Sequence, residues 1–212
     1  MATPVTTDEL LAAAERLIVP GRRTILGITG APGAGKSTLA ARIVEFLGPS
    51  RAVLVPMDGY HLANAVLKAR GLRAVKGAIE TFDDAGYAVL LQRLAAQRPG
   101  ETVYAPGFNR DLEEAIAGSI PVSPEVPLVV TEGNYLLADR GFWPQVRVCL
   151  TESWFLDPEP EQRRQWLIAR HISHGKSAWE ARSWALGTDE RNAVFIGTMA
   201  DRADRVLRIA EL

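Results

Sequence analysis

The chain has 212 residues, of which 47% are hydrophobic and 23% charged, with a formal net charge of −1; this balance is typical of a folded globular protein and gives no sign of a nucleic-acid-binding protein. A single cysteine, Cys149, excludes a disulfide framework within the chain and favours a reducing compartment such as the cytoplasm. The first residues lack a secretory signal pattern, and no apolar stretch approaches the roughly 18 residues of a membrane helix, so we expect a cytoplasmic protein that has no membrane-spanning segment.

The first elements follow from capping and apolar periodicity. Thr6 and Glu9 have the spacing of a capping box, which predicts a helix over about residues 7–18. The apolar run at 24–29 predicts a short buried strand. A glycine-rich loop comes next, and a helix is predicted from about 36 to 47.

The rest of the chain continues this alternation. Further strands are predicted at 52–56, 126–131, 153–156 and 205–209, and further helices at 84–97, from 160 onwards and at 178–186. Alternating strands and helices predict an α/β fold with a parallel sheet between two helical layers, as one domain over residues 1–212. Two stretches, 70–83 and 98–125, fit poorly because they are rich in Gly, Pro and charge, so we expect functional insertions there.

A phosphate-binding loop is predicted between the strand at 24–29 and the helix at 36–47. It matches G-x-x-x-x-G-K-[ST] and consists of Gly30, Ala31, Pro32, Gly33, Ala34, Gly35, Lys36 and Ser37, with Thr38 after it. Glycines let the backbone N–H groups curl around phosphate oxygens, and the following helix adds its positive N-terminal end. Lys36 reaches the terminal phosphates and Ser37 binds Mg²⁺. A plain Gly-rich turn would explain the glycines but not Lys36 and Ser37.

Two acidic residues follow predicted strands and are expected at the same site, because ligands of open α/β sheets bind at the carboxyl ends of strands. Asp58 follows the strand at 52–56, where a kinase needs a carboxylate to accept the proton of the attacking hydroxyl. Glu132 follows the strand at 126–131, where it is a candidate for binding Mg²⁺. The alternatives are an ordinary Asp-Gly turn and a solvated strand end.

Together these motifs resemble the phosphoribulokinase, uridine kinase and bacterial pantothenate kinase superfamily, and most of all a sugar or nucleoside kinase-like branch. The similar segments are Met57–His61, Lys76–Asp83 and Tyr104–Arg110. Where relatives have Pro, Tyr and an acid or Ser, this chain has Ile79, Phe108 and Asn109, which leaves the substrate open. The resemblance implies a P-loop NTPase fold with five parallel core strands, the phosphate-loop strand in the middle, a small substrate-binding insertion and a helical lid.

The resemblance also implies roles for particular residues. Asp58, Lys36, Glu132 and Arg170 are the expected catalytic residues, with ATP and Mg²⁺ as the nucleotide and metal. We expect the acceptor to contact Asp58, Tyr60, His61, Lys76, Glu80, Phe82, Tyr104, Phe108, Arg110 and Asn134.

A lid is expected over about residues 160–190. Arg163 and Arg170 are seven residues apart and so share one helix face, whereas Arg164 points elsewhere and is expected to be exposed. Lid arginines of related kinases offset the charge of the transferring phosphoryl group, and Arg170 is the favoured candidate. The alternative for this stretch is a solvated charged face.

The leading hypothesis is a kinase that transfers the γ-phosphate of ATP to a hydroxyl of pantothenate, a nucleoside, a sugar or a sugar phosphate. The alternative is an NTP-hydrolysing regulatory switch that needs no small acceptor. The chain has no Asn-Lys-x-Asp motif for reading guanine. The expected partners are ATP and the metabolite, and the resemblance is compatible with a homodimer.

Overall fold

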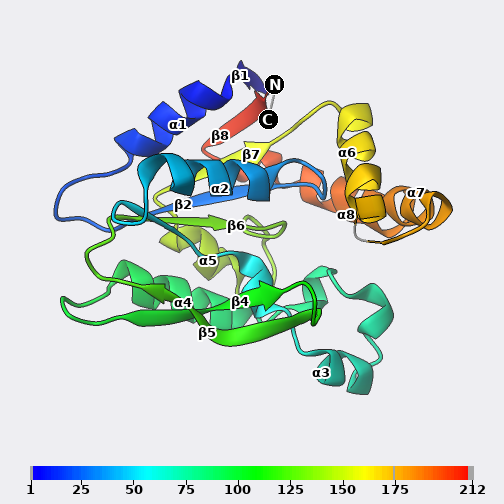
Figure 1. Cartoon of the computed structure of the whole chain (residues 1–212), viewed down its shortest axis with the longest axis horizontal. Helices are drawn as coiled ribbons and strands as arrows, with labels where there is room; N and C mark the ends of the chain where they lie inside the picture. The colour runs from blue at the N-terminus through cyan, green and yellow to red at the C-terminus, as the bar shows by residue number, and fades with distance from the viewer. Residues whose placement is uncertain (1, 174, 210–212) are drawn as a thin grey trace.

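A six-stranded parallel sheet forms the centre of the molecule, in the order β1-β8-β7-β2-β6-β3 (Figure 1). The computed structural model describes residues 2–173 and 175–209, so residue 174 of the predicted lid lies outside the described residues. The strands are β1 (Thr3–Val5), β2 (Thr24–Gly30), β3 (Ala52–Leu54), β6 (Leu128–Glu132), β7 (Glu152–Leu156) and β8 (Arg205–Ile209). The phosphate-loop strand β2 lies between β6 and β7, as predicted.

All five predicted core strands are present, and the sheet contains one strand more than the five expected. The additional strand, β1, pairs in parallel with β8 at the edge of the sheet. Its three residues are too few to show a period-two pattern, and they are ordered here by pairing with a strand roughly 200 residues away rather than by local sequence.

Helices cover both faces of the sheet and make a three-layer sandwich, as predicted. One face carries α1 (Thr7–Arg16) and α2 (Lys36–Leu47), and the other carries α4 (Asp84–Ala95), α5 (Trp143–Cys149) and α8 (Thr188–Gly197). Alternate strand residues serve the two cores: Leu128 and Val130 face the α1–α2 side, whereas Val129 faces the α4–α5 side. Because successive side chains of a strand point to opposite faces, one apolar strand supplies both layers.

The predicted capping box is present at the start of α1. The main-chain N–H of Glu9 donates to Thr6 Oγ1 over 3.2 Å, and Glu9 accepts from the main-chain N–H of Thr6 over 2.7 Å. The described part of the chain also contains three helices that the sequence pattern did not predict: α3 (Asn64–Ala69), α5 and α8. All three are short, between six and ten residues, and their apolar period is correspondingly weak.

The stretch 98–125, expected to be irregular, contains an antiparallel hairpin of β4 (Val103–Asn109) and β5 (Glu114–Val122). It forms a second, two-stranded sheet that packs on the 3₁₀ helix Met57–Tyr60. The stretch 70–83 contains two short 3₁₀ turns, at Arg73–Val75 and Ile79–Thr81. Both stretches therefore lie next to the residues that follow β3.

At another edge of the molecule, α6 (Pro160–Ser173) and α7 (Ala178–Leu186) pack against each other and lead into α8 (Figure 1). These helices carry many charges. Among residues 2–173 and 175–209, no helix has both the length and the apolar character needed to cross a bilayer.

Candidate active site

The phosphate loop joins β2 to α2 and leaves the start of α2 without a side-chain cap. Gly35 is the N-cap residue of α2, with a φ of +88° that an L side chain rarely adopts, and no side chain accepts a hydrogen bond from the first turn. Gly33 has a φ of +81°, and a Cβ there would lie 2.9 Å from the main-chain oxygen of Arg163. The loop thus presents N–H groups at a positive helix end, which suits a phosphate group.

Lys36 is held at the mouth of this loop. Its side chain is only 8% exposed, and Nζ donates to the main-chain oxygens of Gly30 and Ala31 over 2.8 and 3.0 Å. Burial lowers the pKa of Lys36 to about 8, against the opposing effect of the nearby Glu132 carboxylate. A phosphate oxygen would supply the countercharge that these neutral carbonyls do not.

Ser37 and Glu132 offer oxygen atoms to a metal ion. Ser37 Oγ donates to Glu132 Oε1 over 3.1 Å, and Glu132 is the last residue of the buried strand β6. Burial raises the pKa of Glu132, and the negative charge of Asp58 raises it further. A bound cation would act in the opposite direction and favour the ionised carboxylate. Within the part of the chain that is described, no three acidic, His or Cys side chains cluster as a metal cage. This donor set fits Mg²⁺, which commonly takes one or two protein ligands and completes its shell with phosphates and water.

Asp58 lies in the 3₁₀ helix that follows β3, on the other side of the loop. Its Oδ2 accepts a hydrogen bond from Arg110 Nη2 over 2.6 Å, and its side chain is 27% exposed. His61 Nδ1 lies 3.0 Å from the main-chain oxygen of Asp58. Burial lowers the pKa of His61, which therefore favours the neutral imidazole.

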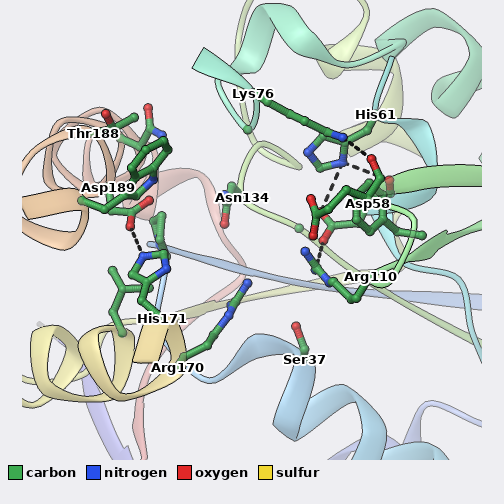
Figure 2. A pocket seen from close by; sticks show the side chains of 18 of the residues that line it. Ser37, Asp58, His61, Lys76, Arg110, Asn134, Arg170, His171, Thr188 and Asp189 are labelled. Atoms are coloured by element: carbon green, nitrogen blue, oxygen red, sulfur yellow. Dashed lines mark hydrogen bonds and ion pairs between the residues drawn. The ribbon is translucent and has the colours of Figure 1, made fainter. Parts of the chain in front are cut away.

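These groups open onto one cleft of about 850 Å³. Figure 2 shows Asp58, His61, Lys76 and Arg110 on one side of it and Arg170 and His171 on the other, with Ser37 below. The predicted residues that line the cleft are Pro32, Lys36, Ser37, Asp58, His61, Lys76, Phe82, Phe108, Arg110, Glu132, Asn134 and Arg170. Segments far apart in the sequence therefore meet at the carboxyl ends of the strands, as expected for an α/β sheet.

Three predicted acceptor contacts do not line the cleft. Tyr104 is 62% exposed, because it alternates along β4 with the buried Val103 and Ala105 and so points away. Tyr60 packs its ring against Tyr87 at 5.2 Å between centroids. Glu80 is exposed on a 3₁₀ turn.

The wall of the cleft opposite α6 combines aromatic rings and cations. The His61 ring lies 4.0 Å from that of Phe82 and 5.0 Å from that of Phe108, between centroids. Arg73 and Glu113 also line this end of the cleft, and sequence reasoning missed both. Neither belongs to a recognisable motif, since a 3₁₀ turn and the hairpin tip bring them there.

The two arginines predicted to belong to a lid, Arg163 and Arg170, lie in different places. Arg170 lines the cleft, whereas Arg163 is 5% exposed and donates from Nη1 to the main-chain oxygen of Pro32 over 3.0 Å. Arg163 also pairs with Glu190 of α8. The expectation that Arg164 is merely exposed is wrong, because its Nη2 lies 2.8 Å from Glu190 Oε1. Arg163 and Arg164 thus tie α6 to α8, with Arg163 also held on the loop.

The helix α8 supplies further cleft residues, of which the resemblance to related kinases indicated only Asn192, near the nucleotide base. His171 Nε2 lies 2.8 Å from Asp189 Oδ2 (Figure 2). Both side chains line the cleft, together with Thr188 and Asn192. The signal for them is weak, because α8 itself was not predicted.

Proteins described as kinases are among those that this chain resembles in sequence and in structure. No family model matches the chain. It is 31% identical over 206 residues to the uncharacterized protein YggC of Escherichia coli, which covers 95% of this chain and 84% of that protein. It is 30% identical over 204 residues to the candidate uridine kinase C227.14 of Schizosaccharomyces pombe, covering 92% and 85%. A crystal structure of a candidate fructose transport system kinase from Silicibacter sp. TM1040 has a TM-score of 0.84 and 35% identity, covering 95% of this chain and 98% of that one.

Proposed function

The chain belongs to the uridine kinase-like P-loop kinases, and from that premise we propose that it transfers the γ-phosphate of ATP to a hydroxyl group of a small metabolite. One observation carries the proposal: the phosphate loop and the Asp58 carboxylate open onto the same cleft. A hydroxyl bound beside Asp58 would face a phosphoryl group held by Lys36. Positioning of this kind provides most of the catalysis in phosphoryl transfer.

In this proposal Asp58 orients the attacking hydroxyl and accepts its proton. Lys36 and the N–H groups at the start of α2 hold the terminal phosphates of ATP. Arg170 lies on the lid side of the cleft, where its charge would offset that of the transferring group. The stretches 70–83 and 98–125 would form the acceptor side and residues 160–190 the lid.

Ser37 and Glu132 would hold Mg²⁺, and the hydrogen bond between them places both oxygen donors at the foot of the cleft. When bound, Mg²⁺ supplies positive charge that offsets the charge of the phosphates. The adjacent residues Lys36 and Ser37 would then have complementary roles. Lys36 would be a fixed positive charge, and Ser37 would be an oxygen ligand of the metal.

The competing function is a regulatory switch that hydrolyses NTP without a small acceptor. Such a switch has no need of a second wall facing the phosphate loop. Here that wall is built from aromatic and cationic side chains of three segments, including His61, Lys76 and Phe108. This favours an enzyme that binds a second small molecule.

The test is ADP release from Mg·ATP by the purified protein, alone and with pantothenate, nucleosides, hexoses and sugar phosphates. Strong stimulation by one compound, and a gain of one phosphate in its mass, would support the kinase and identify its acceptor. Brisk hydrolysis that no compound stimulates, and that Asp58→Asn leaves unchanged, would refute the proposed transfer and favour the switch.

A further inference from the structure

Three cationic side chains line the end of the cleft that faces away from the lid. Arg73 comes from a 3₁₀ turn, Lys76 from the residue after it, and Arg110 from the tip of the β4–β5 hairpin. Only Asp58 and Glu113 are acidic at this end of the described cleft. If Asp58 is reserved for the acceptor hydroxyl, the remaining wall is electropositive.

Two of these cations lie over one aromatic ring. Lys76 Nζ is 5.0 Å from the centroid of the Phe108 ring, and Arg110 Cζ is 4.8 Å from the same centroid. Each cation is attracted to the face of the ring, and the positive charge of Arg110 disfavours that of Lys76. An anion bound between them would offset this effect.

The hydrogen bonds of Lys76 do not neutralise it. Nζ donates to Asn64 Oδ1 over 2.9 Å and to the main-chain oxygen of Glu113 over 2.5 Å, and both of these acceptors are uncharged. The nearby Glu114 carboxylate accepts from the main-chain N–H of Asn64 over 3.0 and 3.1 Å. Lys76 therefore has uncharged hydrogen-bond acceptors, and the Glu113 and Glu114 carboxylates, which favour its charged form, are not hydrogen-bonded to it.

Arg110 connects this wall to the proposed base. Its Nη2 lies 2.6 Å from Asp58 Oδ2, so the arginine occupies one of the two carboxylate oxygens that could accept the hydroxyl proton, and its positive charge opposes the arrival of a proton at either of them. A carboxylate or phosphate on the acceptor offers the same guanidinium an equal or better partner, because both anions can accept two parallel hydrogen bonds from arginine.

We propose that the acceptor carries an anionic group, a carboxylate or a phosphate ester, which binds between Lys76 and Arg110 and takes Arg110 away from Asp58. The inference rests on the proposed role of Asp58 as the base. Water and neutral alcohols cannot compete for Arg110, so the base stays paired and ATP is not hydrolysed wastefully. The anionic group thus determines which acceptor binds, and by pairing with Arg110 it leaves Asp58 free to accept the hydroxyl proton.

Matched pairs of compounds test the selection. ADP release from Mg·ATP is measured with glycerate and glycerol, pantothenate and pantothenyl alcohol, and ribose 5-phosphate and ribose. We expect only the anionic member of a pair to stimulate ADP release. Comparison of the two carboxylates with the sugar phosphate then shows which kind of anionic group the acceptor carries. Stimulation by a neutral member that equals or exceeds its anionic partner would overturn the inference and leave the proposed kinase function intact.

Variants test the release of the base. Arg110→Ala should raise acceptor-independent ATP hydrolysis about tenfold and raise the KM of an anionic acceptor about 10- to 100-fold. Lys76→Ala should raise that KM similarly. The matched control is Lys68→Ala, because Lys68 is an exposed cation of α3 that does not line the cleft; it should change neither quantity.

The hydrolysis measurement decides the inference even if no compound of the panel is a substrate. Unchanged or slower acceptor-independent hydrolysis in Arg110→Ala would show that Arg110 does not restrain Asp58 and would overturn the inference. Faster hydrolysis in Arg110→Ala that is lost again in the double variant with Asp58→Asn would support it. The proposed function fails on a different result, namely brisk wild-type hydrolysis that no compound stimulates and that Asp58→Asn leaves unchanged.

Discussion

Arg163 on α6 and Pro32 in the phosphate loop are joined by a hydrogen bond of 3.0 Å, from Nη1 of the arginine to the main-chain oxygen of the proline. The same guanidinium pairs with Glu190 at the start of α8. Because the Arg163 side chain is buried, both contacts are shielded from water. Helices α6 and α8 are thereby tied to the loop that would hold the phosphates.

We expect Arg163→Ala to lower the free energy of unfolding by about 2–3 kcal/mol, since Glu190 and the Pro32 carbonyl lose a buried partner. The KM for ATP should rise as the loop loses its support. Thermal denaturation and ATP titration measure the two effects. The control is Arg164→Ala, whose half-exposed pairing with Glu190 should contribute less than about 1 kcal/mol. Equal effects of the two variants would contradict a special link to the loop.

Asp58→Asn should lower turnover by about 10²–10⁴ while leaving ATP binding nearly intact, because the amide keeps the shape of the side chain but cannot accept the proton. Single-turnover kinetics and nucleotide binding measure the two quantities separately. Asp111→Asn is the matched control, since Asp111 is exposed and does not line the cleft. A turnover within a factor of two of wild type would remove Asp58 from the role of base.

Glu132→Gln should raise the Mg²⁺ concentration needed for half-maximal activity, because the amide can still accept from Ser37 but carries no charge for the metal. Removal of the metal with EDTA should abolish activity, and added Mg²⁺ should restore it. Glu80→Gln is the control, because Glu80 is exposed outside the cleft. If both variants respond to Mg²⁺ like the wild type, Glu132 is not a metal ligand.

Gly59→Ala should disturb the acceptor side through the hairpin. A Cβ on Gly59 would lie 2.3 Å from the main-chain oxygen of Pro106 in β4, so the hairpin must shift and carry Phe108 and Arg110 with it. We expect a loss of about 1–3 kcal/mol in unfolding free energy and a higher KM for the acceptor. Gly197→Ala has open space around it and should not reduce stability. An unchanged acceptor KM in Gly59→Ala would mean that the hairpin does not position the acceptor.

The parts of the fold that follow from local sequence could be predicted. Thr6 and Glu9 cap α1 as their spacing requires, and the loop that ends at Lys36 and Ser37 joins a buried strand to a helix. Asp58 and Glu132 meet at the cleft because parallel strands end at the same edge of the sheet. In each case the pattern lies within a few residues or follows from a rule of sheet topology.

Features that depend on tertiary contacts could not be predicted. The hairpin β4–β5 is stabilised by packing on the segment after β3, and Pro106 and Gly107 interrupt its pattern at a register shift. The outward direction of Tyr104 depends on that register, and a one-residue difference would have placed it on the other face. The buried position of Arg163 depends on contacts with Pro32 and Glu190, which no helix periodicity contains.

The pairing of β1 with β8 constrains the order in which the molecule is assembled. Thr3 lies opposite Leu207 and Val5 opposite Ile209, so this edge of the sheet joins residues about 200 apart in the chain. On the ribosome, the segment around Thr3 is synthesised about 200 residues before β8 and cannot make this pairing until β8 follows. Contacts between such distant residues are slow to form because a very long loop must close first. We therefore expect the phosphate loop and its neighbours β6 and β7 to be in place before the edge of the sheet is complete.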